Sequence, residues 1–187
     1  MTAVRRTASR NRVRIIAGTW RSRLVRFPDA PGLRPTPDRV RETLFNWLGQ
    51  SLDGLACLDL FAGSGALGFE ALSRGARRVV MVEQDRATAR ALRESAESLD
   101  AANLEIVESE ALRFLESPRE RFDVAFIDPP YASNLVGPVM ERLPRHLAQD
   151  ARVYVESDAR PSLAAGWRTL REERAGAVRF GLYEHRP

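Results

Sequence analysis

Short apolar runs alternate with longer amphipathic stretches through most of the chain. The apolar runs are rich in β-branched residues, and we expect strands at residues 55–61, 78–83, 103–107, 122–127 and 151–156. The stretches between them predict helices near residues 65–74, 86–99 and 134–147, with a short one near 110–116. Strands that alternate with helices in this way are typical of a parallel sheet with helices on both faces.

The two ends of the chain carry a different pattern. Near the amino end, residues 13–18 and 24–27 predict two short strands that form a hairpin. Near the carboxyl end, residues 167–171 and 178–182 lie on either side of a glycine-containing turn. Apolar and polar positions alternate in the second of these segments, which predicts an antiparallel hairpin that closes the sheet.

A helix is predicted between the first hairpin and the sheet. Thr36 has the side chain of a helix cap, Pro37 suits the first helical position, and Asp38 suits the first turn. The apolar face of this helix consists of Val40, Leu44, Trp47 and Leu48. The pattern fits a helix beside a ligand and an ordinary helix that closes the core equally well.

Composition limits the class of protein. A chain of 187 residues that is 44% hydrophobic is long enough for one ordinary domain with a sizeable core. No apolar run approaches the ~20 residues of a membrane span, and the amino end lacks the apolar core of a secretory signal, so we expect a cytoplasmic protein. Cys57 is the only cysteine and is expected to be a buried structural thiol. The two histidines show no ligand spacing with it, so no metal site is predicted.

Positive charge is concentrated at the front of the chain. All 29 basic residues are arginine, and residues 1–50 contain 11 of them against three acids. This part therefore has a net charge of +8, whereas the rest of the chain has −4. A strongly basic amino-terminal part attached to a mildly acidic remainder predicts that residues 1–50 face nucleic acid. The alternative is that these residues form a solvated tail. We therefore divide the chain into a basic extension, residues 1–50, and a main domain, residues 51–187.

The first strand of the predicted sheet ends in a glycine-rich turn. Gly63, Gly65 and Gly68 follow the spacing G-x-G-x-x-G between a strand and a helix, where such a turn cradles a nucleotide-bearing cofactor. Glycine permits positive φ and a close approach of the backbone to a ligand. The motif is a weak signal by itself, because other tight turns and helix starts also use glycine.

Carboxylates follow three of the predicted strands. Asp59 ends the first strand, Glu83 follows Gly63 by 20 positions, and Glu110 comes shortly after the third strand. Glu83 is placed to bind both hydroxyls of a ribose, and Glu110 to accept a hydrogen bond from an adenine amino group. Each acid alone is most simply a solvated charge, but together at one edge of the sheet they predict a nucleoside pocket. The expected cofactor contacts are Asp59, Phe61, Ala62, Gly63, Ser64, Gly65, Gly68, Glu83, Gln84, Glu110 and Ala111.

The fourth strand leads directly into Asp128-Pro129-Pro130-Tyr131. The two prolines stiffen the backbone, so that the Asp128 carboxylate and the Tyr131 ring would be held at fixed positions at the same edge of the sheet. A carboxylate that accepts hydrogen bonds and an aromatic ring at a fixed distance from it suit a planar base with an amino group. This arrangement argues against a nicotinamide cofactor, which would also use the glycine turn and Glu83. A plain proline turn is the structural alternative.

These motifs resemble those of S-adenosylmethionine-dependent amino-methyltransferases. The resemblance rests on residues 59–68, 82–83 and 128–131, and residues 14–18 and 34–46 narrow it to the bacterial 16S ribosomal RNA guanine-N2 methyltransferases. It implies a Rossmann-like α/β fold with a mostly parallel seven-strand sheet whose last strand is antiparallel. The chain departs from the family pattern at Ala17, where a second glycine is expected, and at Glu110, where aspartate is commoner.

The resemblance also implies the cofactor and the reaction. S-adenosylmethionine would donate a methyl group to the exocyclic N2 of a guanine in 16S ribosomal RNA, by direct displacement. Asp128 would accept a hydrogen bond from the amino group, and the Pro129 carbonyl would accept the second one. Tyr131 would stack on the base after it has left its helical stack.

The implied partner is 16S ribosomal RNA, in the small subunit or an assembly intermediate, and we expect a monomer that uses neither a metal nor a membrane. The candidate contacts to RNA are Arg10, Arg12, Arg14, Arg21, Arg34, Arg39 and Arg41. Two other functions remain open. One keeps the mechanism but uses adenine N6 or a protein glutamine as the acceptor, and the other is a non-catalytic RNA-binding module.

Overall fold

The computed structural model describes residues 11–29, 33–117, 121–130, 133–161 and 163–186. Two predicted site residues, Arg10 and Tyr131, lie outside the described residues. Their proposed roles therefore stay predictions.

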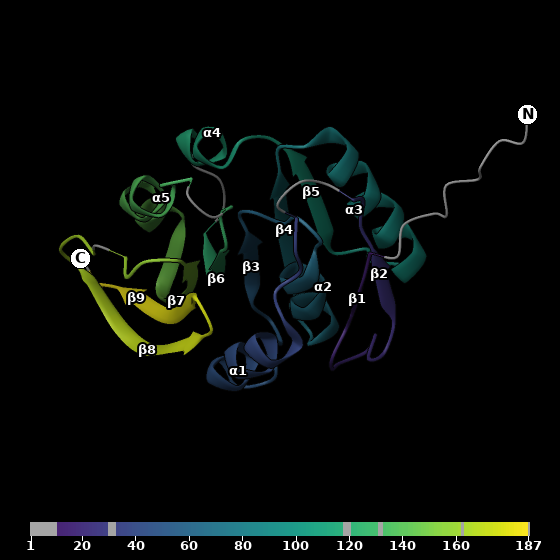
Figure 1. Ribbon diagram of the computed structural model, residues 1–187, viewed down its shortest axis with the longest axis horizontal. Coiled ribbons are helices and arrows are strands. Elements are labelled where there is room, and N and C mark those ends of the chain that lie inside the picture. Colours follow the sequence, from purple (N-terminus) through teal and green to yellow (C-terminus); the bar gives the residue numbers. More distant parts are fainter. Residues whose placement is uncertain (1–10, 30–32, 118–120, 131–132, 162, 187) are drawn as a thin grey trace, which may run out of the picture.

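Seven strands form one sheet in the order β5-β4-β3-β6-β7-β9-β8 (Figure 1). The strands are β3 (Ala56–Asp59), β4 (Arg78–Glu83), β5 (Leu104–Glu108), β6 (Phe122–Ile127), β7 (Leu147–Ser157), β8 (Trp167–Ala175) and β9 (Val178–His185). β3 to β7 run parallel, and β9 lies antiparallel between β7 and β8. The structure confirms the predicted Rossmann-like sheet, including its antiparallel last strand.

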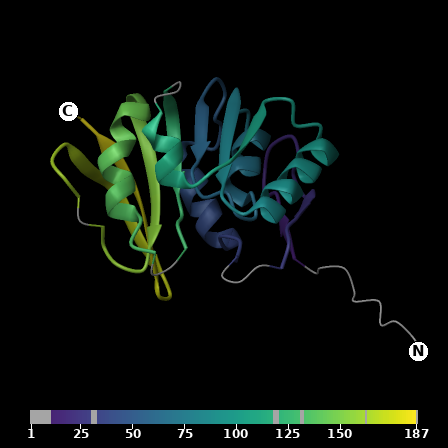
Figure 2. The ribbon, with the colours of Figure 1, turned by 90° about the horizontal axis from the view of Figure 1, so that it is seen from above.

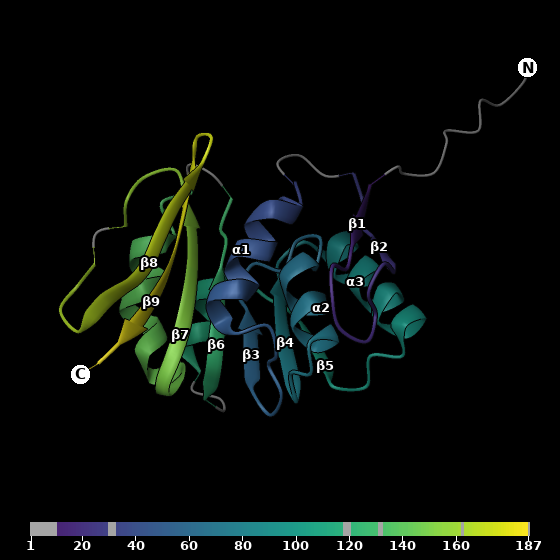
Figure 3. The ribbon, with the colours of Figure 1, turned by 90° about the horizontal axis from the view of Figure 1, so that it is seen from below.

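Helices cover both faces of this sheet. The helices in the described residues are α1 (Asp38–Leu48), α2 (Ala66–Ser73), α3 (Arg86–Leu99), α4 (Ala111–Glu116), α5 (Val136–Arg142) and the 3₁₀ helix η1 (Leu143–His146). Buried side chains of α1, α2 and α3 pack on one face, where α1 and α2 lie over the central strands (Figure 3). Those of α4 and α5 pack on the other face, where the two helices lie together (Figure 2).

The helix predicted over residues 134–147 is divided into α5 and η1. Pro144 lies at the start of η1, and proline has no backbone N–H to continue the α-helical bonds. The carbonyl that would have accepted such a bond, that of Met140, instead accepts one from the indole Nε1 of Trp167 at 3.2 Å. The break therefore leaves a carbonyl that anchors the start of β8.

The chain enters the sheet in the middle, at β3, and proceeds outward through β4 to β5. It then returns to the other side of β3 with β6 and continues outward through β7. Ligands of open α/β sheets bind outside the carboxyl ends of the strands at such a reversal. The fold therefore places the ends of β3 and β6 at the expected binding position.

The predicted amino-terminal hairpin is present and consists of β1 (Arg12–Arg14) and β2 (Leu24–Arg26). It is joined to the main domain by Glu70, a fully buried carboxylate on α2. The backbone N–H groups of Ile16 and Ala17 donate to Glu70 at 2.8 and 3.0 Å. The chain thus accommodates Ala17 at the position where the family pattern has a second glycine.

Gly18 makes the closest contact of this junction. Its φ is +80°, and a Cβ at this position would lie 1.7 Å from the backbone oxygen of Ser73 on α2. Residues of the hairpin and of α1 share one buried cluster with the sheet. The two parts of the chain, residues 1–50 and 51–187, therefore share one hydrophobic core. Their division at residue 50 stays a proposal about charge and RNA contact.

Candidate active site

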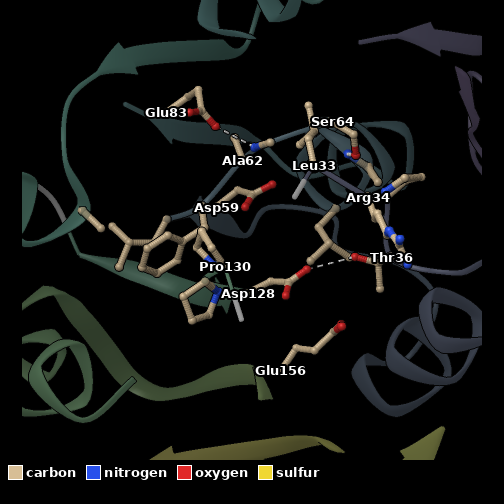
Figure 4. Close-up of a pocket in the computed structure, with 18 of the residues that line it drawn as sticks. Leu33, Arg34, Thr36, Asp59, Ala62, Ser64, Glu83, Asp128, Pro130 and Glu156 are labelled. Atoms are coloured by element: carbon tan, nitrogen blue, oxygen red, sulfur yellow. Dashed lines mark hydrogen bonds between the residues drawn. The ribbon is translucent and has the colours of Figure 1, made fainter. Parts of the chain in front are cut away.

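A cavity of about 800 Å³ opens at the carboxyl edge of the sheet (Figure 4). It is lined by the connector before α1, the glycine turn, the residues that follow β4, β5 and β6, the end of β7 and the β8–β9 turn. Its size is within the range of sites that enclose small molecules and cofactors. Of the predicted cofactor residues, those that line it are Asp59, Phe61, Ala62, Gly63, Ser64, Glu83, Gln84, Glu110 and Ala111.

Gly65 and Gly68 belong to the glycine turn but do not line the cavity. A Cβ at Gly65, whose φ is +76°, would lie 2.6 Å from the Phe69 ring, and one at Gly68 would lie 2.3 Å from Met81 Cε. Gly65 therefore permits the close approach of Phe69 and of Leu92 on α3, and Gly68 permits close packing of α2 against the sheet. Of the three predicted glycines, only Gly63 faces the cavity.

Glu83 is held in place by the glycine turn. Its Oε2 accepts a hydrogen bond from the Gly63 N–H at 2.9 Å, and its Oε1 accepts one from the Asp85 N–H at 2.8 Å. Carboxylate oxygens have further lone pairs, so these two bonds leave acceptor capacity for a ligand. The fixed carboxylate suits a ribose, as predicted from its spacing to Gly63.

Asp59 is buried beneath the turn at the end of β3. Its Oδ2 accepts a hydrogen bond from the Gly68 N–H at 3.0 Å. Burial, together with the negative charge of Glu83, raises the pKa of Asp59 to about 7, although bonds from the Gly68 and Phe61 N–H groups oppose the shift. A positively charged ligand in the cavity would favour the ionised form of this carboxylate.

Asp128 lines the cavity away from Glu83, between Asp59 and Glu156 (Figure 4). Burial raises the pKa of Asp128 well above its usual range, and the negative charges of Glu156 and Asp59 add to this shift. The Thr36 hydroxyl donates a hydrogen bond to Asp128 Oδ2 at 3.2 Å and opposes the shift. Pro129 and Pro130 line the cavity beside the carboxylate.

Thr36 was expected to cap α1, and this prediction is wrong. Pro37 occupies the N-cap position with φ −55° and ψ 147°, and no side chain caps the helix. The Thr36 hydroxyl is directed at Asp128 instead, from a connector that passes over the cavity. Sequence reasoning assigned this side chain to the nearest helix because its real partner is 92 positions away.

Glu156 is a cavity residue that sequence reasoning did not include. It lies near the end of β7, has 4% of its surface exposed and accepts a hydrogen bond at Oε2 from the Tyr154 hydroxyl at 3.0 Å. An acid near the end of a predicted strand was the available signal, the same one that identified Asp59 and Glu83. Its predicted strand, residues 151–156, carried no motif that drew attention to it.

The predicted RNA contacts divide into two groups. Those exposed on the surface of the described residues are Arg12, Arg14, Arg21, Arg34 and Arg39. Arg34 also lines the cavity, and Arg14 forms an ion pair with Asp38 at 3.2 Å.

Arg41 differs from the other arginines because it is fully buried. Its guanidinium lies 2.6 Å from Asp38 Oδ1 and 3.3 Å from Glu70 Oε2, and its Nε donates to the Thr36 carbonyl at 3.1 Å. A phosphate of an RNA strand cannot reach it. The prediction for Arg41 is therefore corrected: it ties α1 to Glu70 and to the connector that carries Thr36.

In the part of the chain that the structure describes, no helix is long and apolar enough to cross a membrane. No group of three or more His, Cys, Asp or Glu side chains in that part of the chain is arranged to hold a metal ion. Cys57 is buried in β3, and burial raises the pKa of its thiol to about 12, so the thiol stays protonated and structural, as predicted.

Comparison with known proteins gives consistent results. The family described as Conserved hypothetical protein 95 matches residues 13–184. A protein of Escherichia coli K12 named ribosomal RNA small subunit methyltransferase D is 45% identical over 177 residues, which are 92% of this chain and 89% of that protein. A protein of the same name from Haemophilus influenzae is 40% identical and covers 95% of this chain and 96% of its own length.

Solved structures show the same likeness. A structure described as a putative methyltransferase from Escherichia coli has a TM-score of 0.86 and 44% identity, and the match covers 94% of this chain and 98% of that one. A structure of a putative methylase from Haemophilus influenzae has a TM-score of 0.81 and 38% identity, and covers 95% of this chain and 100% of that one.

Proposed function

Since the chain belongs to the family of S-adenosylmethionine-dependent small-subunit ribosomal RNA methyltransferases, we propose that it methylates the exocyclic N2 of a guanine in 16S ribosomal RNA. One observation carries the proposal. A single cavity is lined by the fixed carboxylate of Glu83 on one side and by the Asp128-Pro129-Pro130 turn on another. This arrangement suits a nucleoside cofactor and a second, amino-bearing base in the same cavity.

The residues at the Glu83 end fit the cofactor. Glu83 would hold the two ribose hydroxyls, and Glu110, which is exposed at the start of α4, would accept from the adenine amino group. The Gly63 backbone is near enough to the cavity to lie beside the methionine portion. When bound, S-adenosylmethionine supplies a methyl group on a positively charged sulfur. The carboxylates of Asp59 and Glu83 favour a cation in this cavity.

The residues at the Asp128 end orient the acceptor. A guanine amino group is a poor nucleophile because its lone pair is delocalised into the ring, so the site must act mainly by positioning it. Thr36 holds Asp128 Oδ2, which leaves Oδ1 to accept one N–H of the amino group. The Pro129 carbonyl would accept the other N–H. The raised pKa of Asp128 also makes this carboxylate a base that is able to take the proton that N2 loses.

The exposed arginines of the basic extension would contact RNA phosphates. Arg34 lines the cavity and Arg39 lies in the first turn of α1, which supports a role for both in holding phosphates of the RNA strand near the target base. Arg12, Arg14 and Arg21 lie on or next to the hairpin and would contact more distant phosphates. We extend the proposal to Arg10 and to base stacking on Tyr131, and to a monomer that acts in the cytoplasm on the small subunit or its assembly intermediate.

Transfer of a tritiated methyl group tests the proposal. Purified protein and labelled S-adenosylmethionine are incubated separately with free 16S RNA, assembled small subunits, duplex DNA and a protein extract. The proposal predicts label in the RNA of the first or second sample and none in the others. Label in DNA or in protein, or none in any sample while the protein binds the cofactor, would contradict it.

A further inference from the structure

Glu156 lies beside Asp128 at the edge of the sheet. β6 and β7 are parallel neighbours, and Ile127 pairs in register with Val155. The next residue in each segment is an acid: Asp128 directly follows β6, and Glu156 is still part of β7. Neighbouring strands are about 4.8 Å apart, so the two side chains leave the sheet as neighbours. Both side chains extend into the same cavity, with the Glu156 carboxylate directed toward Asp128 and Thr36 (Figure 4).

The Glu156 carboxylate is buried, with one polar contact from its own strand and apolar side chains along the neighbouring wall. Tyr154, two positions earlier on the same face of β7, donates to Oε2 at 3.0 Å. Phe180 pairs with Glu156 in register on β9, and Val178 and Ala175 line the adjacent wall of the cavity. Burying a carboxylate there and setting it beside a second acid both cost free energy. A base that donates hydrogen bonds to both acids would offset that cost.

Guanine has two neighbouring donors that match two neighbouring carboxylates. Its Watson–Crick edge presents N1–H next to the amino group on C2, whereas adenine presents an unprotonated N1 that only accepts. Asp128 and Pro129 are assigned to the amino group in the proposed function. We propose that Glu156 accepts a hydrogen bond from guanine N1–H and thereby determines which base enters the cavity. This inference rests on the proposed function and names the residue that makes it specific for guanine.

The base 2-aminopurine provides the probe. It carries the same 2-amino group as guanine, but its N1 has no hydrogen and it has no O6. The guanine that the wild-type protein methylates is first located in the product. RNA is then prepared, free or in a reconstituted subunit, with 2-aminopurine at that position. For each protein, the transfer rate to guanine-containing RNA is divided by the rate to 2-aminopurine-containing RNA. The loss of O6 affects this ratio equally in every protein, so a difference between proteins reports on N1.

Glu156→Gln is the decisive variant, because an amide can donate to the N1 of 2-aminopurine. We expect the wild-type protein to prefer guanine over 2-aminopurine, and the variant to lose roughly 10- to 100-fold of that preference, which corresponds to one charge-assisted hydrogen bond. Glu173→Gln is the matched control. Glu173 pairs with the same Phe180 from the β8 side, but it is exposed and lies outside the cavity, so its preference should equal that of the wild type.

The outcomes separate the two proposals. If the wild-type protein methylates no guanine N2, the proposed function fails. If it does so, and Glu156→Gln folds, binds the cofactor and keeps the wild-type preference, the function stands and this inference is wrong. If Glu156→Gln does not fold, Glu156→Asp decides the matter. This variant keeps the charge but withdraws it by one methylene, so at least a tenfold loss on guanine with normal cofactor binding supports the inference, and unchanged transfer overturns it.

Discussion

The two ends of the cavity are built in different ways. At the cofactor end, Glu83 and Asp59 accept hydrogen bonds from backbone N–H groups of the glycine turn, no more than 20 positions away in the chain. At the other end, where we propose that the acceptor base binds, side-chain hydroxyls hold the carboxylates: Thr36 holds Asp128 from 92 positions away, and Tyr154 holds Glu156 from two positions away on the same strand. The cofactor end thus uses backbone donors of one local turn, whereas the acceptor end uses side-chain donors and brings together Thr36, Asp128 and Glu156 from three separate segments.

This difference has a functional consequence. Backbone N–H groups survive most substitutions, so the donors that hold Glu83 and Asp59 do not depend on the identity of the side chains in the turn. Side-chain hydroxyls and carboxylates are changed one at a time, so the acceptor end is where a shared fold can acquire a different substrate. Substitutions at the two ends should therefore affect different steps, and the predictions below test that separation in order of decreasing effect.

The largest effect is expected at Asp128. Asp128→Ala removes the group that we propose accepts a hydrogen bond from the amino group and takes its proton, so methyl transfer should fall by about 10²–10⁴-fold. Asp128→Asn, which keeps the shape but not the charge, should lose nearly as much. Calorimetry should show unchanged cofactor affinity in both variants. A loss of affinity equal to the loss of rate would mean that the two ends are not separate.

Glu83→Ala should give the opposite result. The lost ribose bonds are charge-assisted and worth about 1.5–3 kcal/mol, so cofactor affinity should weaken by roughly 10- to 100-fold. The rate at saturating cofactor should be largely retained, because the acceptor end is intact. Glu108→Ala is the control, since Glu108 is the register partner of Glu83 on β5 but lies outside the cavity. Normal affinity in Glu83→Ala would place the ribose elsewhere.

Thr36→Val should have a smaller effect, visible in the pH profile. The Thr36 hydroxyl stabilises ionised Asp128 and lowers its pKa, so removing it should raise that pKa further. Activity requires the ionised carboxylate and falls as the pH drops through this pKa. The acid limb of kcat/KM should therefore move to higher pH, with a loss of about 3- to 10-fold near neutrality.

Thr36→Ser keeps the hydroxyl and serves as the control for Thr36→Val. Its acid limb should coincide with that of the wild-type protein. If the acid limbs of kcat/KM coincide in the wild-type protein, Thr36→Val and Thr36→Ser, the hydrogen bond from Thr36 does not affect the titration of Asp128.

The smallest effects are expected at the exposed arginines. Arg34→Gln and Arg39→Gln should each reduce the slope of log K for RNA against log salt by about 0.7–0.9, as for the loss of one phosphate contact. Transfer at saturating RNA should change little. Arg168→Gln is the control, because Arg168 is exposed on the far edge strand and forms an ion pair with Glu184. Equal slopes in all variants would remove these arginines from the RNA interface.

The same difference between the two ends explains what the sequence could predict. Gly63, Glu83 and Asp128 were found from spacing and position at strand ends, because local motifs and a parallel sheet place them in a fixed relation. Thr36 and Arg41 were assigned wrongly, since proximity in the chain favoured a helix cap and a surface contact. Thr36 contacts Asp128, which follows β6, and Arg41 contacts Glu70 on α2 as well as Asp38 on its own helix. The contacts with Asp128 and Glu70 depend on how the connector and α1 lie across the sheet.

Glu156 could not be ranked from the sequence for a related reason. Its importance depends on the register of β6 with β7, which makes it the neighbour of Asp128. Nothing in the residues around it fixes that register. The order of strands and helices, by contrast, follows from the local hydrophobic pattern, because short apolar runs form strands that are buried on both faces and each amphipathic helix buries one face against the sheet.

The identity of the methylated nucleoside tests the account most directly. 16S RNA or small subunits are treated with the wild-type protein and, in parallel, with Asp128→Ala, and the RNA is digested to nucleosides for mass spectrometry. The account predicts N2-methylguanosine at a single position with the wild-type protein and none with the variant. Methylation of adenine N6, or N2-methylguanosine formed equally well by Asp128→Ala, would contradict it.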